Sequence, residues 1–250
     1  MGYVIAMAGK GGTGKTTIAA LIIRIIKEKG LGSILAIDAD PNSNLAEALG
    51  VETKATIGSI LDDISAQPDI VPSGMGKDHF IEYQVQTAIS EADGFDVLTM
   101  GRPEGPGCYC YVNNALRNVM SKLIKDYDYI VIDNEAGLEH LSRRTTRSAD
   151  ALVVVSGPAM AGLKAAKRIR DLTRELKIKT AKELLVINCC DNDVEQEKIG
   201  PLKLDYLGFI PQDKEIEKMS LNGSCLFKLS TESKGLQALR KIGEVIWQRN

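Results

Sequence analysis

The sequence predicts an α/β fold of three layers, in which a mostly parallel central sheet is flanked by helices. Three observations predict this fold. Short β-branched runs alternate with amphipathic stretches of helical length along the chain. Runs such as residues 129–132 are wholly apolar, as is typical of strands that are covered on both faces. A glycine-rich turn at residues 9–14 joins the first run directly to the first amphipathic stretch.

The individual elements follow from these patterns in chain order. The apolar runs predict strands at 3–8, 33–38, 95–100, 128–132, 151–155, 183–188 and 205–210. Apolar residues at helical spacing predict covering helices, joined by right-handed crossovers, at 16–29, 111–126, 159–177 and 234–247. Proline and glycine predict exposed connections at 64–80 and 101–107.

Length and composition predict a single domain over residues 1–250. The chain is 44% apolar and 26% charged, and no Pro/Gly/Ser-rich linker divides it. Its net charge of −2 provides no overall attraction to nucleic acid or to an anionic membrane. The N-terminus enters a strand directly, and no apolar stretch approaches the ~20 residues that span a bilayer, so we expect a cytoplasmic protein. In that compartment its five cysteines stay reduced.

The glycine-rich turn fits the phosphate-binding pattern G-x4-G-K-[ST]. It follows a predicted strand and opens a predicted helix, a context that disfavours a chance glycine-rich turn. In such a P-loop, backbone N–H groups surround the phosphates, the lysine lies near the β- and γ-phosphates, and the hydroxyl binds Mg²⁺. The sequence thus predicts a P-loop NTPase fold, with a nucleotide site at Gly9, Lys10, Gly11, Gly12, Thr13, Gly14, Lys15, Thr16 and Thr17.

Carboxylates follow two of the predicted strands where the strands end. Asp133 ends an apolar strand, as does an aspartate that holds Mg²⁺ through water, while Asp38 and Asp40 lie at the end of the second strand. Asp38 is either a group near the Mg²⁺ or a simple capping residue. Gly137 occupies the place where a backbone N–H meets the γ-phosphate, so we expect hydrolysis to move the segment after it.

The base is less well defined by the residues alone. Residues 188–191 read Asn-Cys-Cys-Asp, which partly matches the guanine-reading motif Asn-Lys-x-Asp without its lysine. This pattern by itself leaves both purines open.

A cysteine pair precedes the predicted helix at 111–126. Cys108 and Cys110 lie near the start of that helix, where thiol pKa values fall. One chain provides two sulfurs, whereas a twofold dimer brings four together. Thiolates suit Ni²⁺, Zn²⁺, Cu⁺ or an iron–sulfur cluster, and the spacing does not choose among them. The alternative is two ordinary loop cysteines.

Residues 10–16 resemble the deviant Walker A motif of the family that contains nitrogenase iron protein and the Min and Par ATPases. The resemblance implies an ATP-sandwiched homodimer in which Lys10 reaches the partner's nucleotide, and turnover that is slow until the dimer forms. It implies that Asp40 orients the attacking water and that Lys10, Lys15 and Asp40 serve catalysis. It also favours ATP as the nucleotide and places Asn188, Pro211 and Asp213 around its adenine.

Two further segments, 107–110 and 137–141, resemble the nickel-insertion ATPases of carbon monoxide dehydrogenase maturation, known as the CooC family. This resemblance implies ATP/ADP and Mg²⁺ as ligands and a metal at Cys108 and Cys110, nickel first with zinc as an alternative. It implies a homodimer promoted by nucleotide and metal. The implied client is carbon monoxide dehydrogenase or acetyl-CoA synthase, with neither a nucleic acid nor a membrane as partner.

Two alternatives come from the wider family. A redox ATPase like nitrogenase iron protein carries a shared iron–sulfur cluster, but its cysteines lie in two separate segments, and here none lies near Asp133. A Min-like or Par-like positioning ATPase needs a membrane-seeking C-terminal helix or a basic face for DNA. The tail at 236–247 is amphipathic without a strongly basic face, so we expect it to pack on its own sheet.

Overall fold

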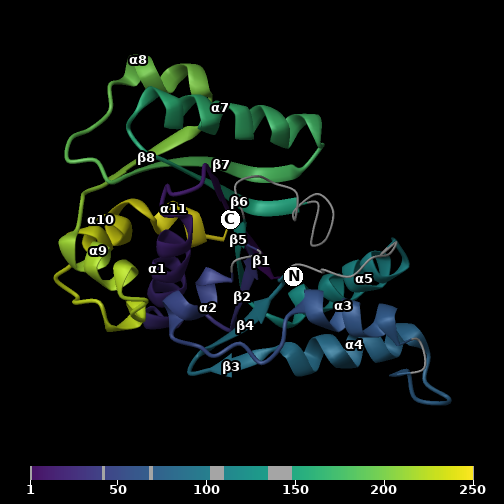
Figure 1. Cartoon of the computed structure of the whole chain (residues 1–250). Helices are drawn as coiled ribbons and strands as arrows, with labels where there is room; N and C mark the ends of the chain where they lie inside the picture. The colour runs from purple at the N-terminus through teal and green to yellow at the C-terminus, as the bar shows by residue number, and fades with distance from the viewer. Residues whose placement is uncertain (1, 41–42, 68–69, 102–109, 135–147, 250) are drawn as a thin grey trace.

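The chain folds around one eight-stranded sheet with helices on both faces (Figure 1). The computed structural model describes residues 2–40, 43–67, 70–101, 110–134 and 148–249. The strand order is β3-β4-β2-β5-β1-β6-β7-β8, and of these described strands only the edge strand β3 is antiparallel to its neighbour. The strands are β1 (Tyr3–Gly9), β2 (Ile34–Ala39), β3 (Ser90–Ala92), β4 (Phe95–Thr99), β5 (Tyr129–Asn134), β6 (Ser148–Ser156), β7 (Lys179–Asn188) and β8 (Asp205–Ile210).

Two apolar cores lie on opposite faces of the sheet, which confirms the three predicted layers. One face is covered by α3 (Ile57–Ala66), α4 (Lys77–Ala88), α5 (Cys110–Asp126), α7 (Met160–Glu175), α8 (Gln196–Ile199) and the 3₁₀ turn η2 (Gly200–Leu202). The other is covered by α1 (Lys15–Glu28), α2 (Asn44–Leu49), α9 (Lys214–Leu221), the 3₁₀ turn η3 (Leu226–Lys228), α10 (Lys234–Ile242) and α11 (Glu244–Trp247).

The parallel register brings the charged strand ends together. β1 lies at the centre between β5 and β6, and β2 lies on the other side of β5. Asp38 and Asp133 are direct partners across β2 and β5, while Met7 of β1 is the partner of Asp133 on its other side. Because side chains alternate along a strand, the two acids lie on the same face of the sheet as α1. The phosphate loop therefore opens at the edge where both acids end their strands.

Two predicted segments differ from the structure. The connection predicted at 64–80 is shorter, because α3 continues to Ala66 and α4 begins at Lys77. A capping box starts α3, in which Thr56 accepts a hydrogen bond from the Ser59 backbone at 3.0 Å. The helix predicted at 234–247 is divided at Gly243, where an added Cβ would lie 2.5 Å from the Trp247 ring.

The structure also bears on the predicted relation to membranes. No helix among the described residues combines the length and apolarity that crossing a lipid bilayer requires.

Candidate nucleotide site

The phosphate loop runs from the end of β1 to the start of α1 and depends on its glycines. Gly12 and Gly14 have φ of 77° and 87°, in the left-handed region that favours glycine. Inside the loop, the Lys10 carbonyl oxygen accepts hydrogen bonds from the Thr13 hydroxyl at 2.9 Å and from Lys15 Nζ at 3.3 Å. This conformation leaves the turn open at the N-terminus of α1, where an anion is stabilised.

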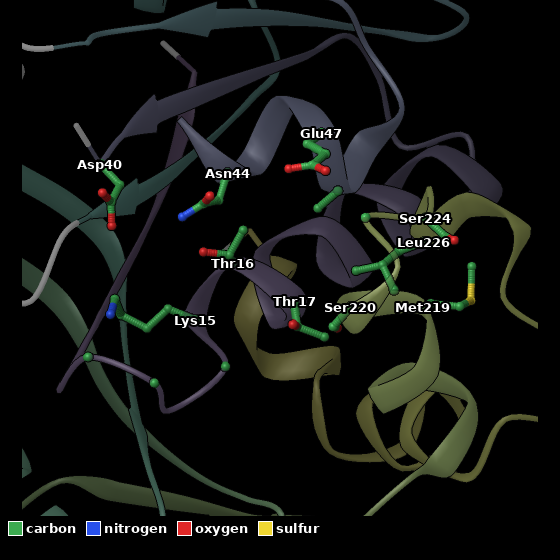
Figure 2. A pocket seen from close by; sticks show the side chains of 15 residues that line it. Lys15, Thr16, Thr17, Asp40, Asn44, Glu47, Met219, Ser220, Ser224 and Leu226 are labelled. Atoms are coloured by element: carbon green, nitrogen blue, oxygen red, sulfur yellow. The ribbon is translucent and has the colours of Figure 1, made fainter. Parts of the chain in front are cut away.

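The two lysines of the loop have different environments. Lys15 is 7% exposed, whereas Lys10 is exposed to solvent. Figure 2 shows the Lys15 side chain extending toward Asp40 across the pocket that contains the loop. A lysine buried beside carboxylates can serve a nucleotide of its own chain, whereas an exposed lysine at the mouth can reach outward.

Thr16 and Asp133 form an oxygen-rich pair beside the loop. The Thr16 hydroxyl donates to Asp133 Oδ2 at 2.6 Å, and Asp133 Oδ1 is buried with no hydrogen-bond partner among the described residues. Burial raises the pKa of Asp133 to about 7, and the nearby Asp38 and Asp40 add to the effect against the Thr16 hydrogen bond and Lys15. The Thr16 hydroxyl and the Asp133 carboxylate, one oxygen of which is buried without a partner, fit Mg²⁺, whose charge would favour the ionised carboxylate.

Asp38 holds the segment that carries Asp40. It is fully buried, and its two oxygens accept from the backbone N–H groups of Asp40 at 3.2 Å and Leu45 at 2.7 Å. Burial raises the pKa of Asp38 to about 6 against these hydrogen bonds. Of the two roles expected for Asp38, the geometry directly displays the capping one. Each oxygen of Asp38 keeps a further lone pair, so the capping contacts leave a role near Mg²⁺ open.

A pocket of about 580 Å³ extends from the phosphate loop to α2, to the end of α9 and to the segment after α9. Figure 2 shows Lys15, Thr16, Asp40 and Asn44 around the same space. The sequence reasoning identified the loop and Asp40 but missed the rest of the wall. The additional lining residues are Asn44, Glu47, Ala48, Met219, Ser220, Gly223, Ser224 and Leu226. Asn44 and Glu47 are three residues apart on α2, a spacing that could have indicated a shared face, whereas no motif marks residues 219–226.

A second pocket of about 290 Å³ adjoins the loop beyond Gly14 and Thr17. Its apolar wall consists of Ile18, Leu21, Ile210, Pro211 and Ile216, and its polar residues include Asn188, Gln212, Asp213 and Glu217. These dimensions and this mixture of surfaces suit a purine base.

Two details of this pocket bear on the expected base contacts. Asp191, the counterpart of the guanine-reading acid, does not line the pocket. Asp213 lines it, but its carboxylate binds backbone N–H groups of Glu215 and Ile216 and also the hydroxyl of Ser233 and the N–H of Gly235. Burial opposes its ionisation, but these hydrogen bonds outweigh burial and lower its pKa. Asp213 therefore organises the wall of the pocket.

The structure describes only some of the remaining predicted residues. Gly137 and Cys108 lie outside the described residues, and so does the side chain of Cys110, although α5 begins at Cys110 as the predicted helix start implied. Cys189, to which the sequence assigned no role, lines the second pocket, where burial and then Glu217 raise its thiol pKa. Among the described residues, no group of three or more His, Cys, Asp or Glu side chains is arranged to hold a metal ion.

Comparisons with known proteins agree with this geometry. Residues 4–227 match the model of the CobQ/CobB/MinD/ParA nucleotide binding domain. An ATP-binding protein of Methanocaldococcus jannaschii is 41% identical over 97% of this chain and 98% of its own length. The carbon monoxide dehydrogenase accessory protein CooC of Rhodospirillum rubrum is 33% identical, with 90% of each chain covered.

Solved structures share the same fold. The septum site-determining protein MinD of Pyrococcus horikoshii, complexed with Mg-ADP, superposes with a TM-score of 0.70 at 23% identity over 98% of this chain and 96% of its own. MinD of Pyrococcus furiosus has a TM-score of 0.70 at 25% identity, with 98% of both chains covered. With the family match over 4–227 and the ATP-binding relatives, these similarities show that the chain belongs to the CobQ/CobB/MinD/ParA family of nucleotide-binding domains and is an ATPase.

Proposed function

We propose that this ATPase is an accessory protein that delivers a metal ion, nickel first, to carbon monoxide dehydrogenase or acetyl-CoA synthase. The observation that carries the proposal is the similarity to CooC over 90% of both chains, combined with the cysteine pair at the start of α5. The other relatives support ATP binding without indicating a client.

The hydrolytic step uses the residues around the phosphate loop. Lys15 and the loop N–H groups bind the phosphates, and Thr16 with Asp133 would hold Mg²⁺, which neutralises charge that develops during phosphoryl transfer. Asp40, held over the pocket by Asp38, orients the attacking water. Gly137, which lies outside the described residues, is the residue whose backbone N–H we assign to the γ-phosphate. Pro211 and Asn188 contact the adenine from the second pocket.

Dimerisation completes this site. Lys10 is exposed at the mouth of the loop and is free to reach the nucleotide of a second copy, adding positive charge near the transferred phosphoryl group. Turnover is therefore slow in the monomer and accelerates when two chains enclose ATP. Dimerisation therefore sets the rate of the ATPase cycle, which times the protein's action.

The cysteine pair supplies the metal site. α5 begins at Cys110, and Cys108 precedes it by two residues in the sequence. A helix N-terminus is a setting that lowers thiol pKa values in general. A twofold dimer contributes four sulfurs, the set that soft metal ions take in closed sites. Because ATP closes the dimer, metal affinity is linked to nucleotide state, and by reciprocity bound metal favours the dimer.

The test is anaerobic binding of Ni²⁺ and Zn²⁺ to the unmodified protein and to the Cys108→Ser/Cys110→Ser variant, each with ADP or ATP. Sedimentation of the same samples reports the dimer fraction. We expect one metal ion per dimer, binding that needs both cysteines, and a dimer fraction that rises with metal. If neither the metal nor the substitutions change the dimer fraction, the metal-delivery role is excluded and the ATPase assignment stands.

Two alternative functions would use the same ATP-hydrolysing site. An iron–sulfur redox ATPase would show a visible absorption band after anaerobic isolation. A Min-like positioning ATPase is supported by the MinD of Thermotoga maritima, which is 30% identical over 75% of this chain and 64% of its own length. The packing of the C-terminal helices in the core opposes a membrane-seeking tail.

A further inference from the structure

Asn188 connects the base pocket to the phosphate loop. It is the last residue of β7, it lines the second pocket, and its Nδ2 donates to the Thr13 carbonyl oxygen at 2.9 Å. The amide also packs against the loop backbone, since a Cβ added at Gly14 would lie 2.3 Å from Asn188 Nδ2. One side chain thus borders the base site and contacts the turn that receives phosphate.

The strand end that carries Asn188 is well anchored. Asn188 is the register partner of Ile210 in β8, and the Cys190 N–H donates to the Ile210 carbonyl at 3.1 Å. Between them, Cys189 has a φ of 55° and makes the sharp turn. Cys190 Sγ then donates to the Asn192 carbonyl at 2.8 Å. Asn188 is therefore a fixed point on the sheet against which a loop can be held.

The Thr13 carbonyl is a sensitive point in the loop. Gly12 and Gly14 flank Thr13, and both have left-handed φ values, where backbone rotation meets little steric resistance. The peptide group is planar and trans, so the Thr13 carbonyl and the Gly14 N–H point in opposite directions. Holding the carbonyl against Asn188 therefore directs the Gly14 N–H to the other side, toward the open turn at the start of α1.

We infer that Asn188 is a positioning residue for the phosphate loop, which acts on bound phosphates through the Thr13–Gly14 peptide. Its contribution then extends to ligands that have no base at all. The Thr13 hydroxyl and the Thr13 N–H both donate to the Lys10 carbonyl, at 2.9 and 3.4 Å, so the bond from Asn188 is the one that fixes the carbonyl end of this residue. The inference rests on the nucleotide site of the proposed function and is independent of the metal and the client.

The experiment compares a ligand with a base and one without. Calorimetry measures binding of Mg-ATP and of Mg-tripolyphosphate to the unmodified protein and to Asn188→Ala. Loss of one neutral hydrogen bond is expected to weaken both ligands by about three- to tenfold. Ile216→Ala is the matched control, because it removes an apolar wall of the same pocket without a bond to the loop. It should weaken ATP and leave tripolyphosphate unchanged.

Two results would overturn the inference. If Asn188→Ala weakens ATP but binds tripolyphosphate as the unmodified protein does, Asn188 acts on the base alone. Steady-state hydrolysis gives the second criterion: a displaced loop raises KM and also lowers kcat at saturating ATP, whereas unchanged kcat and KM contradict positioning. Asn188→Asp removes the donor at nearly constant shape and should behave at least as poorly. Thermal melts identify a variant that merely unfolds, and loss of ATP binding in the unmodified protein would instead refute the nucleotide site.

Discussion

At the scale of single residues, the site concentrates negative charge in a buried place. Asp38 and Asp133 are buried side by side, and Lys15 is the buried cation near them. Burial raises the pKa of both acids, to about 6 and about 7. In the ligand-free protein, burial of these two carboxylates in their ionised form therefore lowers the free energy of unfolding. A divalent cation bound with its nucleotide removes this penalty.

This cost predicts a pH dependence of stability in EDTA. Both acids have folded pKa values above their unfolded values near 4, so the folded protein binds more protons between about pH 4 and pH 7. The free energy of unfolding should fall as the pH rises through that window. Carboxyl groups whose pKa is lowered, such as that of Asp213, change the free energy of unfolding only below this pH window. Urea midpoints measured across the window check this, and Asp133→Asn should show a flatter profile. An equal slope in Asp133→Asn would contradict the assignment.

The contrast between the two loop lysines gives a second prediction at this scale. Lys15→Ala removes a buried charge from the phosphate site and should weaken ATP binding by about 10²-fold or more. Lys10→Ala should leave ATP affinity within about threefold but lower kcat by about 10²-fold or more, if Lys10 serves the partner's nucleotide. Activity per chain measured over a range of protein concentrations is the decisive readout. A Lys10→Ala protein whose specific activity still rises with concentration would refute the role across the dimer.

At the scale of elements, α9 covers the nucleotide site with little burial of its own. None of its residues is buried, yet Ser220 lines both pockets and Met219 packs on the core beside α1. Its position depends on Asp213, whose Oδ1 caps α9 while its Oδ2 binds Ser233 and Gly235 at the start of α10. One carboxylate thus sets the relative position of two helices.

Asp213→Ala should therefore lower the free energy of unfolding by about 2–3 kcal/mol in the absence of nucleotide. Asp205→Ala, at an exposed position that begins β8, is the matched control and should change it by less than about 0.5 kcal/mol. Chemical denaturation measures both. Unchanged stability with a large loss of ATP affinity would show instead that Asp213 contacts the nucleotide directly, as the family resemblance implies.

At the scale of the whole molecule, the C-terminus closes the apolar core instead of extending from it. Leu239, Ile246 and Trp247 are buried against the α1 face of the sheet. The Tyr129 hydroxyl donates to the Trp247 carbonyl at 2.9 Å, and Lys182 Nζ donates to the Gln248 carbonyl at 2.6 Å. These contacts hold the tail to the strand ends opposite the nucleotide site, because Tyr129 begins β5 and Asp133 lies near its end. Figure 1 shows α10 and α11 beside α1.

This packing predicts a simple spectroscopic result. Trp247 is the only tryptophan and is 3% exposed, so its emission should be blue-shifted. Adding ATP together with anionic vesicles should leave the emission unchanged and should not sediment the protein. The unfolded protein in urea provides the red-shifted reference. A spectral change accompanied by ATP-dependent co-sedimentation would favour the Min-like alternative.

Short sequence patterns predicted many of the site residues, because the chemistry of the site depends on short fixed spacings. The glycine and lysine spacing of the loop and the acids that end apolar strands needed no knowledge of distant contacts, whereas the parallel pairing that brings Asp38 beside Asp133 is visible only in the structure. No helix was predicted at 57–66, where the structure has α3. Its capping box pairs Thr56 with Ser59 in place of the usual Glu or Gln, so the sequence pattern did not mark where the helix starts. The pocket wall at 219–226 carries no motif, so only its position over α1 reveals it.

The sequence by itself determined the fold class, the phosphate loop, the two acids and the membership of a nucleotide-binding family, since these rest on period, spacing and strand-end chemistry. Only the tertiary structure decided that Asp38 caps the segment bearing Asp40, that Asp213 links α9 to α10, and that Asn188 holds Thr13. Each of those three contacts joins groups whose partner is chosen by how the elements pack. A hydrogen bond depends on distances of a few tenths of an ångström, which a linear pattern of residue types does not encode.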